Sequence, residues 1–446
     1  MSQSHSASYR LSASEASQKI ASGELTCLEL VESCLERIHE REDAIGAWAT
    51  LDAVAAIRKA KELDRLRLER SDDSRLPLEG IPIGVKDVID TKALATQYGS
   101  SIYRDHVPQV DAACVERLAA AGAIILGKTV TAEFATYQPG GTANPLDIRR
   151  TPGGSSSGSA AAVADFHVPL AVGTQTAGSV IRPASFCGIM GFKPTRDRYP
   201  VAGMMATSKS LDTLGTFART SSDLALLDGV LNNDAQAFTA QQEGTVPLHD
   251  LRLALCKTAA WPQASKSVHA AVNRCCEALR ERGAKVDEIS LPQEYAALVE
   301  AHKLIHVREA ASELGELRRI HPDKVSSKLR DLIEEGDQVS DADYREATRL
   351  QRSCAREFAG IMGDADLLIT PATIGPAPHG LDSTGDPIFC RLWTALGVPC
   401  FTFTAAFDGE SGMPLGVQLV GGAHTDQHFL QACRTIEQQI GLNHDK

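Results

Sequence analysis

Residues 145–220 combine two properties that rarely occur in one segment. They are rich in Gly, Ser, Thr and Pro, and they contain the small apolar run GSAAAVADFHVPLAVGTQTAGS at 158–179. A solvated linker is polar throughout, so this run is too apolar to be one. We predict a buried, tightly packed core segment in which glycines allow backbone segments to approach closely. The rest of the chain must fold around it.

Segments on both sides alternate between helical and strand-like patterns. Residues 78–90 (LEGIPIGVKDVID) are apolar and β-branched, which is typical of a buried strand and its exit. The run DAACVERLAAAGAIILGK (111–128) predicts a helix with Asp111 as its N-cap and Gly122 just past its end, followed by the strand AIIL. Residues 267–291 repeat this order of helix, glycine and strand.

Residues 251–255 and 366–371 are also strand-like, so α and β elements alternate around a largely covered sheet. Residues 12–43 predict two amphipathic helices joined near Gly23. Residues 293–363 are helical and charged, and we expect them to sit over a site rather than in the central sheet.

The bulk properties exclude several classes of protein. No segment approaches the roughly 18 consecutive apolar residues of a membrane span, and the N-terminus lacks a signal-peptide pattern, so we expect a cytoplasmic protein without membrane contact. The net charge of -12, with no basic stripe, argues against nucleic acid as a ligand. Eleven cysteines without a C-x-x-C pair predict free thiols rather than disulfides or a zinc site.

The run GAIILGKT (122–129) matches the phosphate-binding P-loop pattern letter for letter. A P-loop has a strand before the first glycine, a loop between the glycines and a helix after the lysine. Here a helix precedes Gly122 and an apolar strand lies between the glycines, so the backbone N–H groups would belong to a sheet. The nucleotide-hydrolase interpretation is disfavoured.

The run GSSSG (154–158) fits the G-x-S-x-G nucleophile elbow and points to Ser156. The elbow follows an apolar strand, whereas NPLDIRRTPGG is polar and broken by proline. A histidine-based triad is also disfavoured because no histidine downstream has a distinctive setting. These histidines are His302, His306, His379, His424 and His428.

A buried, neutral lysine is another way to activate a serine, because burial lowers the pKa of an ammonium group. Lys86 emerges from the apolar run IPIGV and is a candidate for such a base. The alternative is a surface lysine at a strand end, paired with Asp87. The spacing alone leaves both interpretations open.

The run GTQTAGSVIRPAS (173–185) is the second glycine-rich segment. Its small residues would let backbone N–H groups approach a ligand oxygen, as an oxyanion hole next to Ser179 requires. The alternative is a tight turn in a packed core, which the residues by themselves do not exclude.

Three segments together carry a family resemblance: GIPIGVKD (80–87), GGSSSGS (153–159) and GTQTAGSV (173–180), in that order. The chain resembles the amidase signature family. Further similar runs are AGAIILGKTVTAEF and CGIMGFKPT, and the likeness spans nearly the whole chain except 293–363. It implies a single large α/β domain over 1–446 with a central mixed sheet covered by helices on both faces. It also implies N-terminal helices over 1–70 that pack on this domain.

The resemblance implies that Ser179 is the nucleophile, Lys86 the base, and Ser155 the serine that bridges them after a cis peptide. Ser155 and Ser179 are 24 positions apart, as in the family, and Ser156 is then a neighbour. The oxyanion would be bound by the backbone N–H groups of Thr176, Ala177 and Gly178.

The turn departs from the family pattern in three ways. Gln175 replaces an aspartate, Ala177 replaces a glycine, and Arg182 lies three rather than two residues after the serine. The shifted arginine resembles the malonamidase-like branch, where it binds a substrate carboxylate. That branch is also similar to amidases that cleave aryl amides and carbamates. The interpretation that Arg182 has only a structural role therefore stays open. Gln175 and Arg198 are further candidates for substrate binding.

The implied function is an amidase that cleaves a carboxamide or carbamate C–N bond without metal or organic cofactor. The substrate is a small molecule, and a homodimer stays open. The alternative is the amidase component of an amidotransferase complex, built from several different proteins, that releases ammonia from glutamine. A catalytically idle relative is disfavoured by the intact Lys86, Ser155 and Ser179. Residues 293–363 and the loop 131–137 would shape the substrate pocket.

Overall fold

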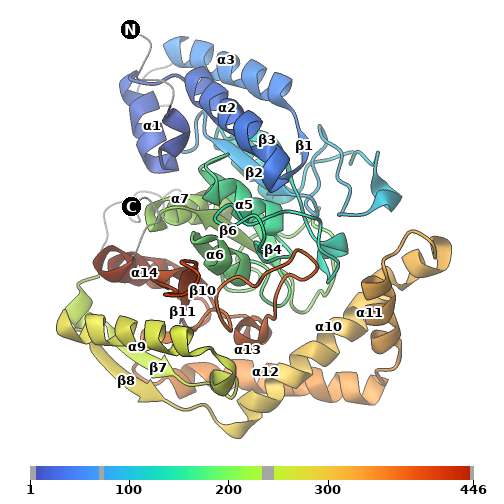
Figure 1. The fold of residues 1–446 in the computed structure, drawn as a ribbon, viewed down its shortest axis with the longest axis vertical. Helices are drawn as coiled ribbons and strands as arrows, with labels where there is room; N and C mark the ends of the chain where they lie inside the picture. Colours follow the sequence, from blue (N-terminus) through green and yellow to red (C-terminus); the bar gives the residue numbers. More distant parts are fainter. Residues whose placement is uncertain (1–6, 70–74, 234–245, 442–446) are drawn as a thin grey trace.

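The computed structural model describes residues 7–69, 75–233 and 246–441. Within these ranges, eleven strands form one sheet (Figure 1). From one edge to the other the strands are β1 (Trp48–Leu51), β3 (Ile124–Thr129), β2 (Pro82–Lys86), β4 (Leu170–Gln175), β6 (Thr213–Ala218), β5 (Met190–Lys193), β10 (Cys400–Phe407), β11 (Pro414–Val420), β9 (Leu367–Pro371), β7 (Arg252–Cys256) and β8 (Lys285–Ile289).

The sheet is mixed. The pairs β2–β3, β2–β4, β7–β9 and β7–β8 are parallel, and the remaining pairs are antiparallel. Every residue of β2, β4, β5, β6, β9 and β11 is buried, so both faces of the central sheet are covered. The prediction of a single α/β domain with a covered mixed sheet is confirmed.

Thirteen α-helices of the described residues flank the sheet. In Figure 1 the N-terminal helices lie at one end of the long axis and α9 to α12 at the other, with β4, α5 and α6 between them. The helices are α1 (Ala13–Ser22), α2 (Cys27–Ile45), α3 (Ala53–Glu69), α4 (Ala113–Ala120), α5 (Ser157–Ala164), α6 (Ile181–Cys187), α7 (Ser221–Asn232), α9 (Lys266–Glu281), α10 (Gln293–Ile320), α11 (Ser327–Asp337), α12 (Asp341–Met362), α13 (Ile388–Leu396) and α14 (Asp426–Ile440).

The N-terminal region begins with the two predicted helices. Capping boxes at Ser12 and Thr26 start α1 and α2, and Gly23, with φ of 81°, ends α1 in the left-handed conformation that favours glycine. The region also contributes β1, which pairs with β3 at the sheet edge. Within the predicted N-terminal region 1–70, residues 7–69 are described, and they are partly built into the sheet in addition to packing on it.

The helix α4 begins two residues after the position predicted for its cap. Its N-cap is Ala112, without a side-chain hydrogen bond, so the prediction that Asp111 caps it was wrong. The Asp111 carboxylate instead accepts the backbone N–H of Lys92 at 2.8 Å. The following strand β3 runs through Thr129, which places the G-K-T letters of the P-loop pattern inside the sheet, as the sequence indicated.

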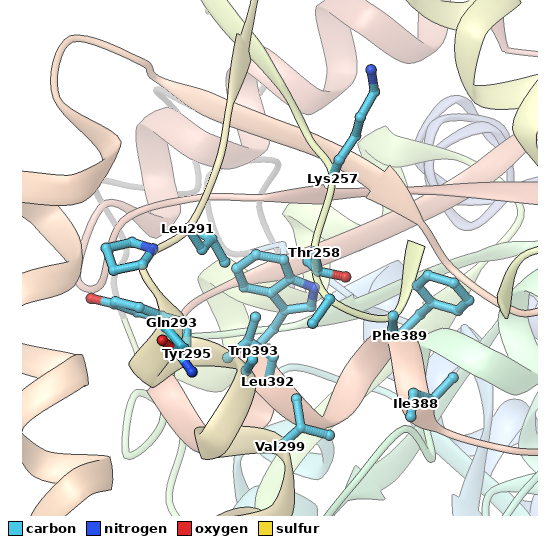
Figure 2. A pocket seen from close by; sticks show the side chains of 14 residues that line it. Lys257, Thr258, Leu291, Gln293, Tyr295, Val299, Ile388, Phe389, Leu392 and Trp393 are labelled. Carbon is cyan, nitrogen blue, oxygen red and sulfur yellow. The ribbon is translucent and has the colours of Figure 1, made fainter. Parts of the chain in front are cut away.

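The helical segment 293–363 forms α10, α11 and α12, as predicted. A cavity of about 230 Å³ lies between the start of α10, the start of α13 and the loop that follows β7 (Figure 2). This cavity is outside the serine-containing segments.

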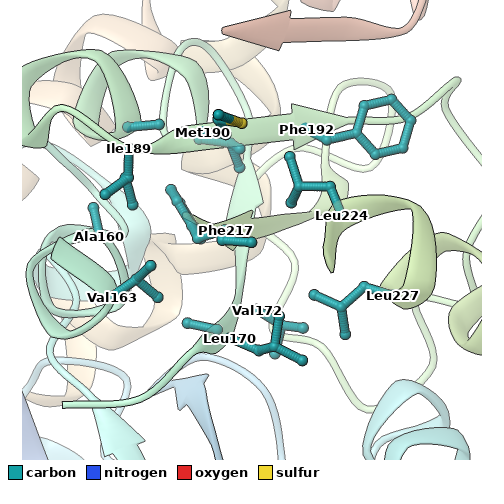
Figure 3. Packing of buried hydrophobic residues seen from close by; sticks show 14 of the residues in the cluster. Ala160, Val163, Leu170, Val172, Ile189, Met190, Phe192, Phe217, Leu224 and Leu227 are labelled. Atoms are coloured by element: carbon teal, nitrogen blue, oxygen red, sulfur yellow. The ribbon is translucent and has the colours of Figure 1, made fainter. Parts of the chain in front are cut away.

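The segment 145–220 is the packed core that its composition predicted. It supplies α5, α6 and the strands β4, β5 and β6, whose apolar side chains meet those of α7 (Figure 3). A Cβ atom on Gly173 would lie 2.7 Å from Ser156 Oγ, and one on Gly158 would lie 2.2 Å from Ala47 O. Only glycine permits these approaches. The first brings the serine loop (GGSSSGS, 153–159) onto β4, and the second brings the start of α5 against Ala47.

All eleven cysteines are buried and free, which confirms the prediction of free thiols. Among the described residues, no group of three or more His, Cys, Asp or Glu side chains is arranged to hold a metal ion. Within the same ranges, no helix has the length and apolar content needed to cross a membrane.

Candidate active site

Lys86 is the last residue of β2 and is fully buried. The parallel pairing of β2 with β4 brings the ends of both strands to the same edge of the sheet. There Lys86 Nζ lies 2.8 Å from Ser155 Oγ and 2.8 Å from Thr174 Oγ1. Asp87 does not pair with it, because its carboxylate lies 3.5 Å from the amine of Lys128. The alternative of a surface lysine paired with Asp87 was wrong.

Burial lowers the pKa of Lys86 to about 7, and the negative charge of Asp212 opposes this shift. The pKa of Asp212 is itself raised by burial to about 6, against the hydrogen bonds and the nearby Lys86 that lower it. A large fraction of Lys86 is therefore the neutral amine near pH 7, and only this form can accept a proton.

The serines of the serine loop lie in different environments. The Gly154–Ser155 peptide is cis, and Ser155 faces Lys86. Ser156 is fully buried at the N-cap of α5, where its hydroxyl bonds the backbone N–H and carbonyl of Thr174 at 3.3 and 3.2 Å. Its hydroxyl is thus engaged with the backbone of β4. The elbow geometry that would expose Ser156 as a nucleophile is absent from this described loop.

Ser179 lies in the turn between β4 and α6 and keeps 7% of its surface exposed. Its hydroxyl makes no hydrogen bond with any residue in the described ranges. The turn lies against the serine loop, because Arg182 Nη2 donates to Gly154 O at 2.6 Å and Ser156 bonds Thr174. The structure therefore forms the Lys86–Ser155 contact and brings Ser179 to a neighbouring turn.

The three carbonyl groups of this turn each accept a hydrogen bond from a different helix. The pairs are His302 Nε2 (α10) to Thr176 O at 2.8 Å, Thr394 Oγ1 (α13) to Ala177 O at 2.8 Å, and Arg182 N (α6) to Gly178 O at 3.0 Å. The N–H of a trans peptide points opposite to its carbonyl. The N–H groups of residues 177, 178 and 179 therefore point away from these three helices.

No backbone N–H of residues 176–179 donates to another residue in the part of the chain that the structure describes. A set of oriented, unused backbone donors beside a serine is the arrangement that stabilises a negatively charged oxygen. The turn is thus able to act as an oxyanion hole.

Gln175 holds this turn at its base. Its Oε1 accepts the N–H groups of Val180 and Ile181 at 2.9 and 3.1 Å, and its Nε2 donates to Thr394 Oγ1 at 3.0 Å. Both atoms of the amide thus bond protein groups, and the side chain is fully buried.

Arg182 is 4% exposed and bonds Gly154 O and Thr384 Oγ1 through Nη2 alone. Its Nε and Nη1 are buried without a partner among the described residues. Burial lowers the pKa of Arg182 to about 10, so the group stays charged at neutral pH. A Cβ atom on Gly178 would lie 3.2 Å from Nη1, which places the unused donor against the turn.

Comparison with known proteins identifies the family to which the chain belongs. The family model described as Amidase matches residues 29–430. The chain belongs to the amidase signature family. It is 36% identical to a glutamyl-tRNA(Gln) amidotransferase subunit of Symbiobacterium thermophilum, over 94% of this chain and 95% of the relative.

Two solved structures share the fold of this amidase-family chain. One belongs to a vestigial protein complex that reveals the evolutionary origins of an s-triazine catabolic enzyme; it is 28% identical, with a TM-score of 0.89, and the match covers 98% of this chain and 100% of that chain. The other is described as an amidase; it is 29% identical, with a TM-score of 0.86, over 97% and 100% of the two chains.

Arg198 is paired with an acidic side chain in this amidase-family chain. Its Nε and Nη2 form a double hydrogen bond with the carboxylate of Asp228 on α7, at 2.8 and 2.7 Å. The Asp228 carboxylate also accepts the hydroxyl of Tyr199 at 2.7 Å. The Nε and Nη2 donors of Arg198 are therefore satisfied by protein groups, without a substrate.

Sequence reasoning missed the groups that orient the turn. His302 was judged to lack a distinctive setting, which was wrong, because it bonds the Thr176 carbonyl and lies 3.3 Å from Arg391 Nη1. Burial and the charge of Arg391 hold the pKa of His302 well below its usual range, so the ring is neutral. The available signal was a pair of histidines four residues apart, His302 and His306, on a helix expected to cover the site.

Proposed function

We propose that this amidase-family chain hydrolyses the C–N bond of a small carboxamide through an acyl-enzyme on Ser179. Lys86 is the base in this proposal, and Ser155 transfers the proton between them. The single observation that carries the proposal is the buried Lys86–Ser155 contact, which lies beside a turn with unused backbone donors. Burial supplies the neutral amine that the base needs.

The first half of the reaction forms the acyl-enzyme. Ser179 Oγ attacks the amide carbonyl carbon while its proton passes to Ser155, and the proton of Ser155 passes to Lys86 Nζ. The carbonyl oxygen becomes negatively charged and is bound by the backbone N–H groups of residues 176–179. Lys86 then returns its proton through Ser155 to the leaving nitrogen, the C–N bond breaks, and the amine or ammonia departs.

The second half releases the acid. Water gives a proton to the same relay and attacks the acyl carbon, and the proton returns to Ser179 as the ester bond breaks. The relay is needed most at the C–N step, because an amine is a poor leaving group until it is protonated.

Arg182 supports a substrate that carries a carboxylate. It is a buried cation with two unused nitrogen donors, and one of these lies against the turn that holds Ser179. A planar guanidinium with free donors matches a carboxylate in charge and geometry. We therefore place small acid amides ahead of neutral aryl amides and carbamates. Gln175 and Arg198 are left out of the substrate contacts, because protein groups occupy their side chains.

The relatives support a second candidate function. Those named as glutamyl-tRNA(Gln) amidotransferase subunits favour a glutamine-hydrolysing component over a hydrolase of aryl amides or carbamates. The same serine and lysine would then release ammonia from glutamine, whose α-carboxylate offers a partner for Arg182. Such a component would work with other protein subunits.

Labelling with a serine-directed fluorophosphonate, mapped by mass spectrometry, tests the proposed chemistry. We expect one modified residue, Ser179, and no labelling of the Ser179→Ala chain. Modification of Ser156 in the wild-type chain would overturn the assignment. Glutamine turnover is then compared between the purified chain and the chain with co-purifying subunits. Glutaminase activity that depends on a partner would select the second candidate.

A further inference from the structure

The helix α13 carries one positively charged side chain, Arg391. Its neighbours Leu392 and Trp393 line the cavity at the start of α10 (Figure 2), whereas Arg391 contacts α10 itself, with its Nη1 3.3 Å from His302 Nδ1. Arg391 is partly exposed, and its guanidinium makes no ion pair and no other hydrogen bond within the described ranges. This cation is therefore joined to an imidazole ring and not to a carboxylate.

The contact with Arg391 decides which nitrogen of His302 carries the hydrogen. A guanidinium has only donors, so Nδ1 of the ring is the acceptor. Burial and the charge of Arg391 hold the pKa of His302 well below its usual range, so the neutral ring has a single hydrogen, on Nε2. That Nε2–H donates to Thr176 O at 2.8 Å. Without a donor at Nδ1, the ring hydrogen is free to move there, and an Nε2 lone pair then faces the carbonyl oxygen.

The carbonyl that His302 holds belongs to the same peptide as the N–H of Ala177. The two groups of a trans peptide point in opposite directions, so fixing the carbonyl also fixes the direction of this N–H. A hydrogen bond to the carbonyl polarises the peptide and strengthens its N–H as a donor. Both the direction and the strength of one donor in the turn at residues 176–179 thus depend on the His302 ring.

We propose that Arg391 is a positioning residue for amide hydrolysis. It fixes His302 as the Nε2–H tautomer, and the ring aims the Ala177 N–H at the oxygen of the reacting carbonyl. This inference rests on the proposed function, because it needs a negatively charged oxygen to be bound at the turn. It assigns to Arg391 an effect on the rate of the chemical step and none on substrate affinity.

The peptide between Thr176 and Ala177 can be observed directly by NMR. The sequence contains seven Thr–Ala pairs, so a chain labelled with ¹³C at the threonine carbonyls and ¹⁵N at alanine gives at most seven HNCO signals. Ala177→Gly identifies the relevant signal by its loss. We expect Arg391→Met to move the Thr176 carbonyl carbon upfield, because the carbonyl loses an accepted hydrogen bond. Arg391→Lys keeps a donor and should move it much less.

Lys303→Met is the matched control for the loss of one positive charge. Lys303 follows His302 on α10, is exposed, and pairs with Glu335 at 2.9 Å. The variant therefore removes a neighbouring cation but no hydrogen bond of the ring. It should leave the Thr176 carbonyl signal unmoved.

Steady-state kinetics on an amide that the wild-type chain hydrolyses gives the second readout. Arg391→Met should lower kcat about tenfold, which is less than the loss of an oxyanion donor itself, and should change KM less than about twofold. Arg391→Lys should recover most of the rate, and Lys303→Met should keep the wild-type kcat.

An unmoved Thr176 signal in Arg391→Met, or an equal shift in Lys303→Met, would overturn the proposal. A raised KM with unchanged kcat would also overturn it, because Arg391 would then be a substrate contact. The spectrum needs no substrate, so the two levels of inference fail separately. A wild-type chain that turns over no amide, but whose Thr176 signal responds to Arg391→Met, would refute the proposed function and leave the control of the turn by Arg391 confirmed.

Discussion

Lys86 Nζ lies 2.8 Å from Ser155 Oγ, with no water-accessible surface on the lysine side chain. An amine in this setting is depleted of its proton near neutral pH, because no solvent stabilises its charge. In the proposed relay, Ser155 connects that amine to Ser179. The first two predictions test this chemistry directly.

Replacing Ser179 by alanine should lower kcat at least about a thousandfold, because the attacking oxygen is lost. Ser156→Ala is the matched control: it breaks the bonds to Thr174 and should lower stability by about 1–3 kcal/mol, while activity falls less than about tenfold. Turnover and thermal melts of both variants check this. The reverse order of activities would refute the assignment of the nucleophile.

The pH profile of kcat/KM should fall on the acid side of about pH 7, since protonated Lys86 cannot act as a base. Each pH unit below that value should cost about tenfold in rate. Asp212→Asn removes the negative charge that raises the Lys86 pKa, so the acid limb should move to lower pH. An unmoved limb would mean that another group controls the profile.

The pH dependence of the free energy of unfolding should also reflect the ionisation of Lys86. Its pKa is about 7 in the folded chain and about 10.4 when unfolded, so between these values the unfolded chain holds the extra proton. Lys86 therefore adds to the free energy of unfolding of the wild-type chain a contribution that rises with pH in this window. Lys86→Met lacks this rise. The stability of the variant relative to wild type should fall by about 2–3 kcal/mol between pH 7 and pH 9.

Urea unfolding of both chains across pH 6 to 9 measures this difference. Groups other than Asp212, whose pKa Lys86 lowers, titrate equally in the two chains, so the subtraction reports Lys86 together with its coupling to Asp212. Parallel pH dependences would show that Lys86 has an ordinary pKa in the folded chain.

Thr394→Val should lower kcat about 10- to 100-fold and change KM little, because Thr394 orients the N–H of Gly178 through the Ala177 carbonyl. Thr394→Ser keeps the hydroxyl and should restore most of the rate. If valine and serine behave alike, the hydroxyl does not position the turn. Steady-state kinetics on one substrate suffices.

Arg182→Met should raise KM at least about tenfold for malonamate-like acid amides and change KM for neutral amides less than about threefold. The variant removes the buried cation but keeps a similar volume. A screen of acid amides, neutral amides, anilides and carbamates provides the comparison. Equal losses across all classes would make Arg182 a structural residue.

The central sheet and the packed segment 145–220 could be predicted because both depend on local patterns. A glycine-rich run too apolar for a linker indicates burial without further information. The setting of Lys86 could not be predicted in this way, because the pattern left a buried base and a surface lysine open, and only the family resemblance favoured the base. The N-cap of α4 could not be predicted so well, since Asp111 and Ala112 are adjacent, and the Asp111 carboxylate bonds the backbone of Lys92, 19 residues away, instead of capping the helix.

The donors to the turn could not be predicted for a different reason. His302 and Thr394 carry no motif, and they lie 126 and 217 residues from the carbonyls that they bond. Their role depends on how α10 and α13 lie against the turn that follows β4, which periodicity does not specify. The bidentate pair of Arg198 with Asp228 is likewise a tertiary contact.

The turn at residues 176–179 is held by hydrogen bonds from three helices, which has a consequence for the protein during its synthesis. Lys86, Ser155 and Ser179 leave the ribosome early, whereas Thr394 follows 217 residues after the carbonyl it holds. On the proposed mechanism, an incomplete nascent chain already contains every reacting group but lacks the ordered turn that would bind the oxyanion. On that mechanism the full rate is reached only once the segment that carries Thr394 has docked, so an incomplete chain would cut surrounding amide bonds slowly.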